Sequence, residues 1–175
     1  MATAGSPSPR ALRGGLLVAF ATFVVLGLPD GVIGTIWPAL RDDLGRTQGS
    51  FGWIMVAISV GYTAASFGSG RLTARMGVGR MVQRSIATSA AGLAIVVTAP
   101  GWWVTVAGFL VLGAGNGGID AGLNAWVALT RGPRAMGTLH AAFGLGATLG
   151  PLLAALFVRS GDWRGAFVVI IAFEA

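Results

Sequence analysis

The feature that most constrains this chain is a series of long apolar runs that contain almost no charge. Residues 14–40 are interrupted only by Asp30, residues 49–70 carry no charge, and residues 85–119 are uncharged throughout. A helix needs ~20 residues to cross the ~30 Å hydrocarbon core of a bilayer, so each run is long enough to span it. The third run exceeds one span, and the pair Pro100–Gly101 divides it into two helices.

These runs predict an all-α membrane protein, a bundle of about 5.5 transmembrane helices. Only 10% of the residues are charged, whereas a soluble domain carries roughly a quarter. Residues 1–13 are expected to form a disordered cytoplasmic tail, and residues 14–175 one transmembrane domain. The expected helices cover about 14–40, 49–70, 82–98, 102–129, 136–158 and, incomplete at the end of the chain, 165–175.

The basic residues of the chain are unevenly divided between the gaps that separate the apolar runs. The side that holds the N-terminus and the gaps after the second and fourth helices carries Arg10, Arg13, Arg71, Arg75, Arg80, Arg84, Arg131 and Arg134, without an acid. Cytoplasmic loops are enriched in arginine, so we expect an inner cell membrane protein with a cytoplasmic N-terminus. The arginines responsible for the net charge of +6 lie in these gaps and not along one face of the protein. Nucleic acid is therefore not expected as a partner.

Two halves of the chain share a pattern of elements. The spacing R-x-G-x-x-R occurs at residues 75–80 after the second helix and at residues 159–164 after the fifth. The first helix carries Asp30 and the fourth carries Asp120, so each three-helix unit begins with an acidic helix. An odd number of spans inverts the second unit in the membrane, and inverted repeats of this kind build many secondary transporters.

The polar residues inside the fourth helix are the strongest candidates for a functional site. Asn116, Asp120 and Asn124 are spaced i, i+4 and i+8, which places them along one helix face. A carboxyl group within a membrane costs ~2.5–3.5 kcal/mol on insertion scales and usually marks an ion or solute path. We expect Asp120 and Asp30 to carry protons and the two amides to bind a polar solute. For Asp120 and the two asparagines, the alternative is a polar clamp between helices with no role in transport. For Asp30, the alternative is a charge at the end of a shorter span.

Several other residues are weaker candidates. His140, about one turn into the fifth helix, is a possible solute- or proton-binding residue, although a histidine at the membrane interface is an equal alternative. Trp126 follows Asn124 by two residues and is a candidate to stack on a sugar ring, with anchoring at the membrane surface as the alternative. Glu174 lies next to the last residue, where we expect the helix to fray.

Specific motifs make the chain resemble the N-terminal half of a major facilitator superfamily transporter. The segment GRLTARMGVGR, residues 70–80, is similar to the signature G-x-L-A-D-R-x-G-R between helices 2 and 3. Ala74 and Val78 depart from that signature, which normally forms a charged gate. The matching residues and the basic end of this gate loop are Gly70, Leu72, Arg75, Gly77 and Arg80. In the fifth helix, Gly146, Gly150 and Pro151 fit G-x-x-x-G-P, which is common in proton antiporters.

The resemblance implies a secondary transporter. The segments around Asp30, Asp120 and His140 look most like the fucose and related sugar:proton symporters, whose acidic residues in helices 1 and 4 fall on Asp30 and Asp120. Drug antiporters usually carry an arginine in helix 4, and residues 102–129 have none. Efflux of a drug or metabolite is the alternative, and a non-transporting membrane fragment is a third.

Within this interpretation, the partners are membrane lipid, protons, a small polar solute, and either a missing C-terminal half or a second copy of the chain. The sequence holds no paired nucleophile and base and no cluster of metal ligands. We therefore expect neither enzymatic activity nor a cofactor or metal.

Overall fold

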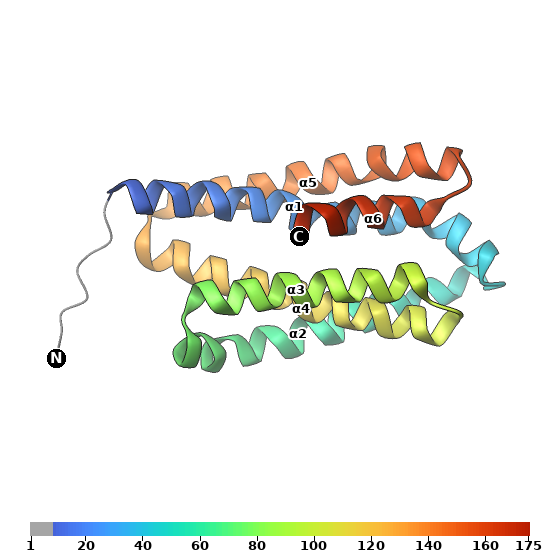
Figure 1. The fold of residues 1–175 in the computed structure, drawn as a ribbon, viewed down its shortest axis with the longest axis horizontal. Coiled ribbons are helices and arrows are strands. Elements are labelled where there is room, and N and C mark those ends of the chain that lie inside the picture. Colours follow the sequence, from blue (N-terminus) through green and yellow to red (C-terminus); the bar gives the residue numbers. More distant parts are fainter. Residues whose placement is uncertain (1–8) are drawn as a thin grey trace.

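The computed structural model describes residues 9–175, with side chains from residue 14, as a bundle in which consecutive helices run in opposite directions and are joined by short connections (Figure 1). The helices are α1 (Pro9–Asp43), α2 (Phe51–Met76), α3 (Val78–Thr98), α4 (Trp102–Thr130), α5 (Pro133–Arg159) and α6 (Trp163–Glu174), with a short 3-10 turn, η1 (Gln48–Ser50), before α2. Five of them, α1 to α5, are long and apolar enough to cross a membrane. The predicted all-α multi-pass bundle is thus confirmed.

The helices extend further than the apolar runs that predicted them. The second helix continues past Gly70 to Met76, and the third begins at Val78 and not at residue 82. Much of the predicted gate loop is therefore helical, because arginine is a good helix former and a charge ends a membrane span without ending a helix. Helix α1 likewise begins at Pro9, and the remainder of the predicted tail, residues 1–8, lies outside the described residues.

The connection between α2 and α3 depends on one glycine. Gly77 has a φ of +83° and is the only residue between the two helices. With its ψ of 157°, Gly77 occupies a backbone region that essentially only glycine adopts, and a residue with a Cβ would lose roughly 1–3 kcal/mol there. A single glycine can therefore reverse the chain where any other residue would be strained.

In the two three-helix units, α1–α3 and α4–α6, the second helix of each unit packs against the first helix of the other. Helix α1 packs along α5, and helix α4 packs along α2, so each acidic helix pairs with the second helix of the other unit (Figure 1). Helix α3 lies against α4, and α6 contacts α1, α3 and α5. This arrangement is the one expected for inverted repeats.

Glycines set the closeness of these helix pairs. A Cβ added at Gly146 or Gly150 of α5 would overlap the backbone carbonyls of Val24 and Leu28 in α1. In the other pair, a Cβ on Gly117 of α4 would overlap the carbonyl of Tyr62 in α2. Without a hydrophobic drive between helices in lipid, close backbone packing of this kind holds a bundle together.

A polar layer separates two apolar clusters within the bundle. One cluster includes Phe109 and Leu112 of α4 with Leu93 of α3, and the other includes Ile119 of α4 and Met81 of α3. Between them along the same helices lie the buried side chains of Asn116 in α4 and Ser89 in α3. The layer is therefore near the middle of both helices, far from either end of the bundle.

The acidic end of the bundle is held by ion pairs and aromatic contacts. Arg164 of α6 pairs with Asp43 of α1 at 2.8 Å, and its Nε donates to the carbonyl of Val97 at 3.2 Å. The Arg164 guanidinium also lies 4.2 Å from the ring centroid of Trp163. These contacts join α1, α3 and α6 at the end opposite the arginine-rich turns.

Candidate functional site

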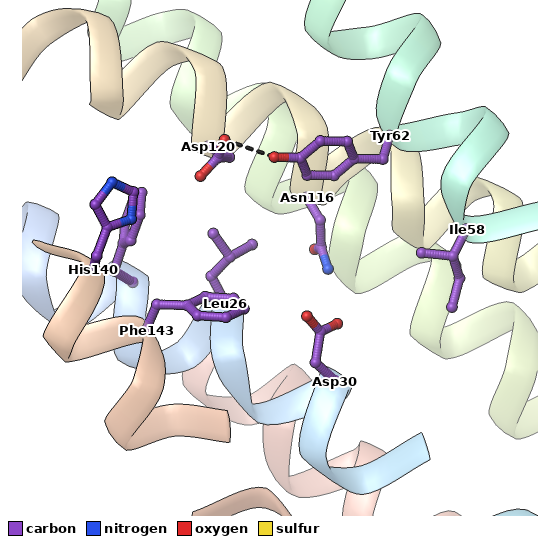
Figure 2. Close-up of a pocket in the computed structure, with 9 residues that line it drawn as sticks. Leu26, Asp30, Ile58, Tyr62, Asn116, Asp120, His140 and Phe143 are labelled. Atoms are coloured by element: carbon purple, nitrogen blue, oxygen red, sulfur yellow. Dashed lines mark hydrogen bonds between the residues drawn. The ribbon is translucent and has the colours of Figure 1, made fainter. Parts of the chain in front are cut away.

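A cavity of about 390 Å³ lies among α1, α2, α4 and α5 and brings together the two predicted acidic residues. We call it the central cavity. Its lining residues are Phe23, Leu26 and Asp30 of α1, Ile58 and Tyr62 of α2, Asn116 and Asp120 of α4, and His140 and Phe143 of α5. Figure 2 shows the side chains of Asp30, Asn116 and Asp120 directed toward one space, with Tyr62 reaching it from the opposite helix.

Asp120 is held in place by two hydrogen-bond donors. The hydroxyl of Tyr62 donates to Asp120 Oδ2 at 2.6 Å, and the amide of Asn124 donates to Asp120 Oδ1 at 3.0 Å. One donor comes from α2 and the other from the next turn of α4. Hydrogen bonds to an ionised carboxylate are short and about twice as strong as neutral ones. The position of Asp120 therefore depends on the packing of α2 against α4.

Asp30 has different surroundings. It belongs to α1, which continues as one helix through Pro29 and Pro38. Its side chain is exposed, lines the central cavity and makes no hydrogen bond to another side chain or backbone group within residues 14–175. The two carboxyl groups are therefore inequivalent, since Asp120 is fixed by protein donors and Asp30 is available to a solute or water.

The side chain of Asn116 contacts both the central cavity and helix α3. Its side chain lines the central cavity, and its Oδ1 accepts a hydrogen bond from Ser89 of α3 at 3.2 Å. The residue is only 6% exposed, so its amide is fixed more firmly than that of a surface asparagine. Ser89 is close because α3 approaches α4 tightly at Gly115, where a Cβ would overlap the Ser89 backbone.

The predicted polar face of α4 is only partly brought to the cavity. Asn116 and Asp120 line it, whereas Asn124 reaches it through its hydrogen bond to Asp120. Trp126 does not line it, which differs from the proposed stacking role. Two residues beyond Asn124 correspond to about 200° of helical rotation, and Trp126 faces α1 and α3, near Gly15 and Val82.

The remaining candidates take distinct places. His140 lines the central cavity, and its ring contacts Phe23 with the centroids 6.3 Å apart. Gly146 and Gly150 instead pack against α1, and Pro151 lies inside α5 beside Gly31. The fifth-helix motif therefore sets the α1–α5 crossing that carries Asp30 and His140.

The gate-loop residues lie outside the central cavity, at the arginine-rich end of the bundle. Gly70, Leu72, Arg75 and Arg80 are exposed, and Gly77 forms the turn. Both ion pairs found in residues 14–175 lie at the opposite end.

Three residues of the site were not proposed from the sequence. Tyr62 and Ser89 are ordinary residues of apolar helices, and only the contacts with Asp120 and Asn116 identify them. Glu174, expected to fray, instead lies with its Oε1 at 2.7 Å from the hydroxyl oxygen of Ser89. Tyr62 is the only tyrosine in the chain, which is the one signal that could have drawn attention to it.

Comparisons with known proteins identify relatives of the chain. The chain is 31% identical over 176 residues to a probable actinorhodin transporter of Streptomyces coelicolor, covering 95% of the chain and 30% of that protein. It is 28% identical over 167 residues to bypass of stop codon protein 6 of Saccharomyces cerevisiae, covering 91% and 33%. It is also 28% identical over 140 residues to sodium-dependent glucose transporter 1A of Mus musculus, covering 78% and 33%.

The chain spans about a third of the length of these curated relatives. Residues 18–175 match the sequence pattern of one family, and this match includes all the residues of the central cavity. The chain forms a multi-pass helical bundle with paired inverted units, and it matches this family over nearly its whole length. The chain therefore belongs to the Major Facilitator Superfamily.

Proposed function

We propose that this chain forms the N-terminal half of a secondary transporter that takes up a small polar organic solute, such as a sugar, together with protons. The observation that carries the proposal is the central cavity, where Asp30 and Asp120 from two different helices face one space in the middle of the bundle. A carboxyl group at this depth is expensive unless it serves an ion or solute path. Membership of the family supports transport, and the similarity to a sodium-dependent glucose transporter supports a sugar as the solute.

The residues of the central cavity have different roles in this proposal. Asp120, positioned by Tyr62 and Asn124, takes up and releases a proton during the transport cycle. Asp30, exposed in the cavity, binds the solute or carries a second proton. The Asn116 amide and His140 supply further hydrogen-bonding groups to a polyhydroxyl ligand. We propose that a C-terminal half, or a second copy of the chain, covers the open side of this cavity, and that lipid surrounds the remainder.

Efflux of a metabolite is a second candidate. The G-x-x-x-G-P motif and the similarity to a probable actinorhodin transporter favour it. The two functions differ in the direction in which a proton gradient drives the solute, so a single assay can separate them.

The first prediction tests proton coupling by adding labelled candidate sugars to membrane vesicles that contain the transporter. Asp120→Asn keeps the shape of the side chain and removes its titratable group. We expect accumulation driven by a pH gradient to fall to passive equilibration, while exchange of solute across the membrane persists, because exchange need not move a net proton. Asp30→Asn should do likewise, or should weaken solute binding.

Asp42→Asn is the matched control, because Asp42 is an exposed acid at the end of α1 that lies outside the central cavity. Gradient-driven accumulation that is unchanged in both cavity variants would contradict a proton role for these residues. Accumulation driven by sodium and not by pH would assign the coupling to a different ion. Solute loss driven by an inward proton gradient would favour efflux.

A further inference from the structure

Glu174 makes a partly buried contact that the proposed transport site does not use. It is the only glutamate in the chain, and its Oε1 lies 2.7 Å from the hydroxyl oxygen of Ser89. Its other oxygen, Oε2, is buried without a hydrogen-bond partner in the described residues. Ser89 in turn donates to Asn116 Oδ1 at 3.2 Å. A continuous polar chain therefore connects α6, through α3, to the Asn116 side chain in the central cavity.

Counting hydrogens along this chain limits its protonation states. The Ser89 hydroxyl has one hydrogen, and the Asn116 carbonyl oxygen can only accept. Ser89 can donate to Asn116 while it also bonds Glu174 only if the Glu174 carboxyl is neutral and donates to Ser89. If Glu174 is ionised, it takes the Ser89 hydrogen, and Asn116 must turn its NH₂ group toward Ser89 to keep a bond. Because one Ser89 hydrogen lies between Glu174 and Asn116, the protonation of Glu174 and the orientation of the Asn116 amide are coupled.

We propose that Glu174 is a second proton-binding site, and that its proton determines which end of the Asn116 amide faces the central cavity. With the proton bound, the Asn116 carbonyl points to Ser89 and its NH₂ group points into the cavity, toward Asp30 (Figure 2). When the proton leaves, the amide reverses and presents its carbonyl oxygen there. A solute group that accepts a hydrogen bond is bound by the first state, and one that donates is bound by the second. This consequence for solute rests on the proposed function.

The surroundings of Glu174 separate it from the first pair of carboxyl groups. It lines a second cavity of about 190 Å³ between α1, α3, α4 and α6, whose other lining residues are Val18, Ala21, Thr22, Val25, Leu26, Ile86, Ile119 and Phe173. None of these can titrate or carry a charge. The ionisable groups of the central cavity are Asp30, Tyr62, Asp120 and His140, and Leu26 lines both cavities. Glu174 therefore influences the central cavity through Ser89 and Asn116 and not through a shared space.

Infrared spectroscopy of the chain in lipid vesicles tests this proposal without a solute or a gradient. The chain contains a single glutamate and two asparagines, so isotope labels on these side chains give few bands. From acid to alkaline buffer, we expect the carboxylic acid band of Glu174 to disappear and the Asn116 carbonyl band to shift with the same midpoint. In Glu174→Gln, whose NH₂ group imitates the neutral acid, the Asn116 band should stay at its acid position at every pH.

Ser89→Ala and Ser85→Ala complete the experiment. In Ser89→Ala the Glu174 band should still titrate, but the Asn116 band should no longer follow it. Ser85 lies one turn earlier on α3 and donates to the Met81 carbonyl of its own helix at 2.9 Å, so Ser85→Ala should behave like the parent. A Glu174 carboxylate band that persists at acid pH, or an Asn116 band that ignores pH in the parent, would overturn the proposal. Since no uptake is measured, the proton site stands or falls independently of the transport function.

Discussion

At the scale of single residues, the site depends on hydrogen bonds between helices more than on the number of polar groups. Asp120 receives a donor from α2 and another from α4, whereas Asp30 has no such partner in the described residues. Tyr62 is 37% exposed and lies in the uncharged, apolar part of α2. Its hydroxyl is nevertheless the shortest link between α2 and the acidic group of α4.

Tyr62→Phe should weaken transport without unfolding the bundle. The variant removes a hydrogen bond to a charged group, which is worth about 1.5–3 kcal/mol, and frees the Asp120 carboxyl to rotate. We expect uptake at limiting solute to fall about tenfold or more, since 1.4 kcal/mol corresponds to a factor of ten.

Ser66→Ala is the control for this measurement, because Ser66 lies on the same helix and its hydroxyl bonds only the carbonyl of Gly117 across the same α2–α4 pair. Uptake in Ser66→Ala should match the parent. If Tyr62→Phe also transports at the parental rate, the phenol does not position Asp120.

At the scale of elements, backbone contact at glycines places the side chains of the cavity. Helix α1 meets α5 where Gly27 and Gly31 oppose Gly146 and Gly150, and this contact carries Asp30 toward His140. Helix α4 meets α2 and α3 through different glycines of the same run, since Gly117 opposes Tyr62 and Gly115 opposes Ser89. The segment between residues 113 and 118 is therefore a packing surface on two sides.

Gly146→Ala and Gly144→Ala differ only in what the added methyl group meets. At Gly146 it would overlap the Val24 carbonyl, and forced overpacking of this kind typically costs 1–3 kcal/mol. At Gly144 nothing lies within 4 Å, so the change should be neutral or slightly stabilising because alanine favours a helix. Thermal unfolding in detergent should show a lower midpoint for Gly146→Ala alone. Equal midpoints for the two variants would show that the α1–α5 contact is not tight in the folded bundle.

At the scale of the whole molecule, the two ends of the bundle differ in charge. The turns after α2 and α4, at the same end as the start of α1, hold arginines without an acid, while the other end holds Asp42, Asp43 and Asp162 (Figure 1). Arginine-rich ends remain in the cytoplasm. The charge distribution of the assembled bundle thus supports the orientation proposed from the sequence.

Single cysteines can test this orientation, because the chain has no cysteine of its own. Thr47→Cys and Pro100→Cys, at the acidic end, should react with an impermeant thiol reagent added to intact cells. Gly79→Cys and Gly132→Cys, at the arginine-rich end, should react only after the membrane is opened, and an added Cβ meets nothing within 4 Å at either glycine. Labelling of Gly79→Cys in intact cells would reverse the proposed topology.

The spans, the arginine-rich side and the acidic helices followed from the sequence alone. Span length and loop charge are properties of consecutive residues, and the cost of a carboxyl group in lipid singled out Asp30 and Asp120 without any structure. The helix ends were less accurate, because an arginine such as Arg71 ends an apolar run but continues the helix. The motif glycines of the fifth helix were recognised, but not their contact with α1.

Which side chains meet across helices was decided only by the tertiary structure. Tyr62 and Asp120 are 58 positions apart, and Ser89 and Glu174 are 85 apart. Their contacts depend on how far each helix is rotated about its axis and how closely its glycines let it approach a neighbour, and no local pattern records either quantity. The same rotation turned Trp126 away from the cavity and gave Glu174 a buried partner, because half a turn of a helix separates a residue that lines a cavity from one that packs against another helix.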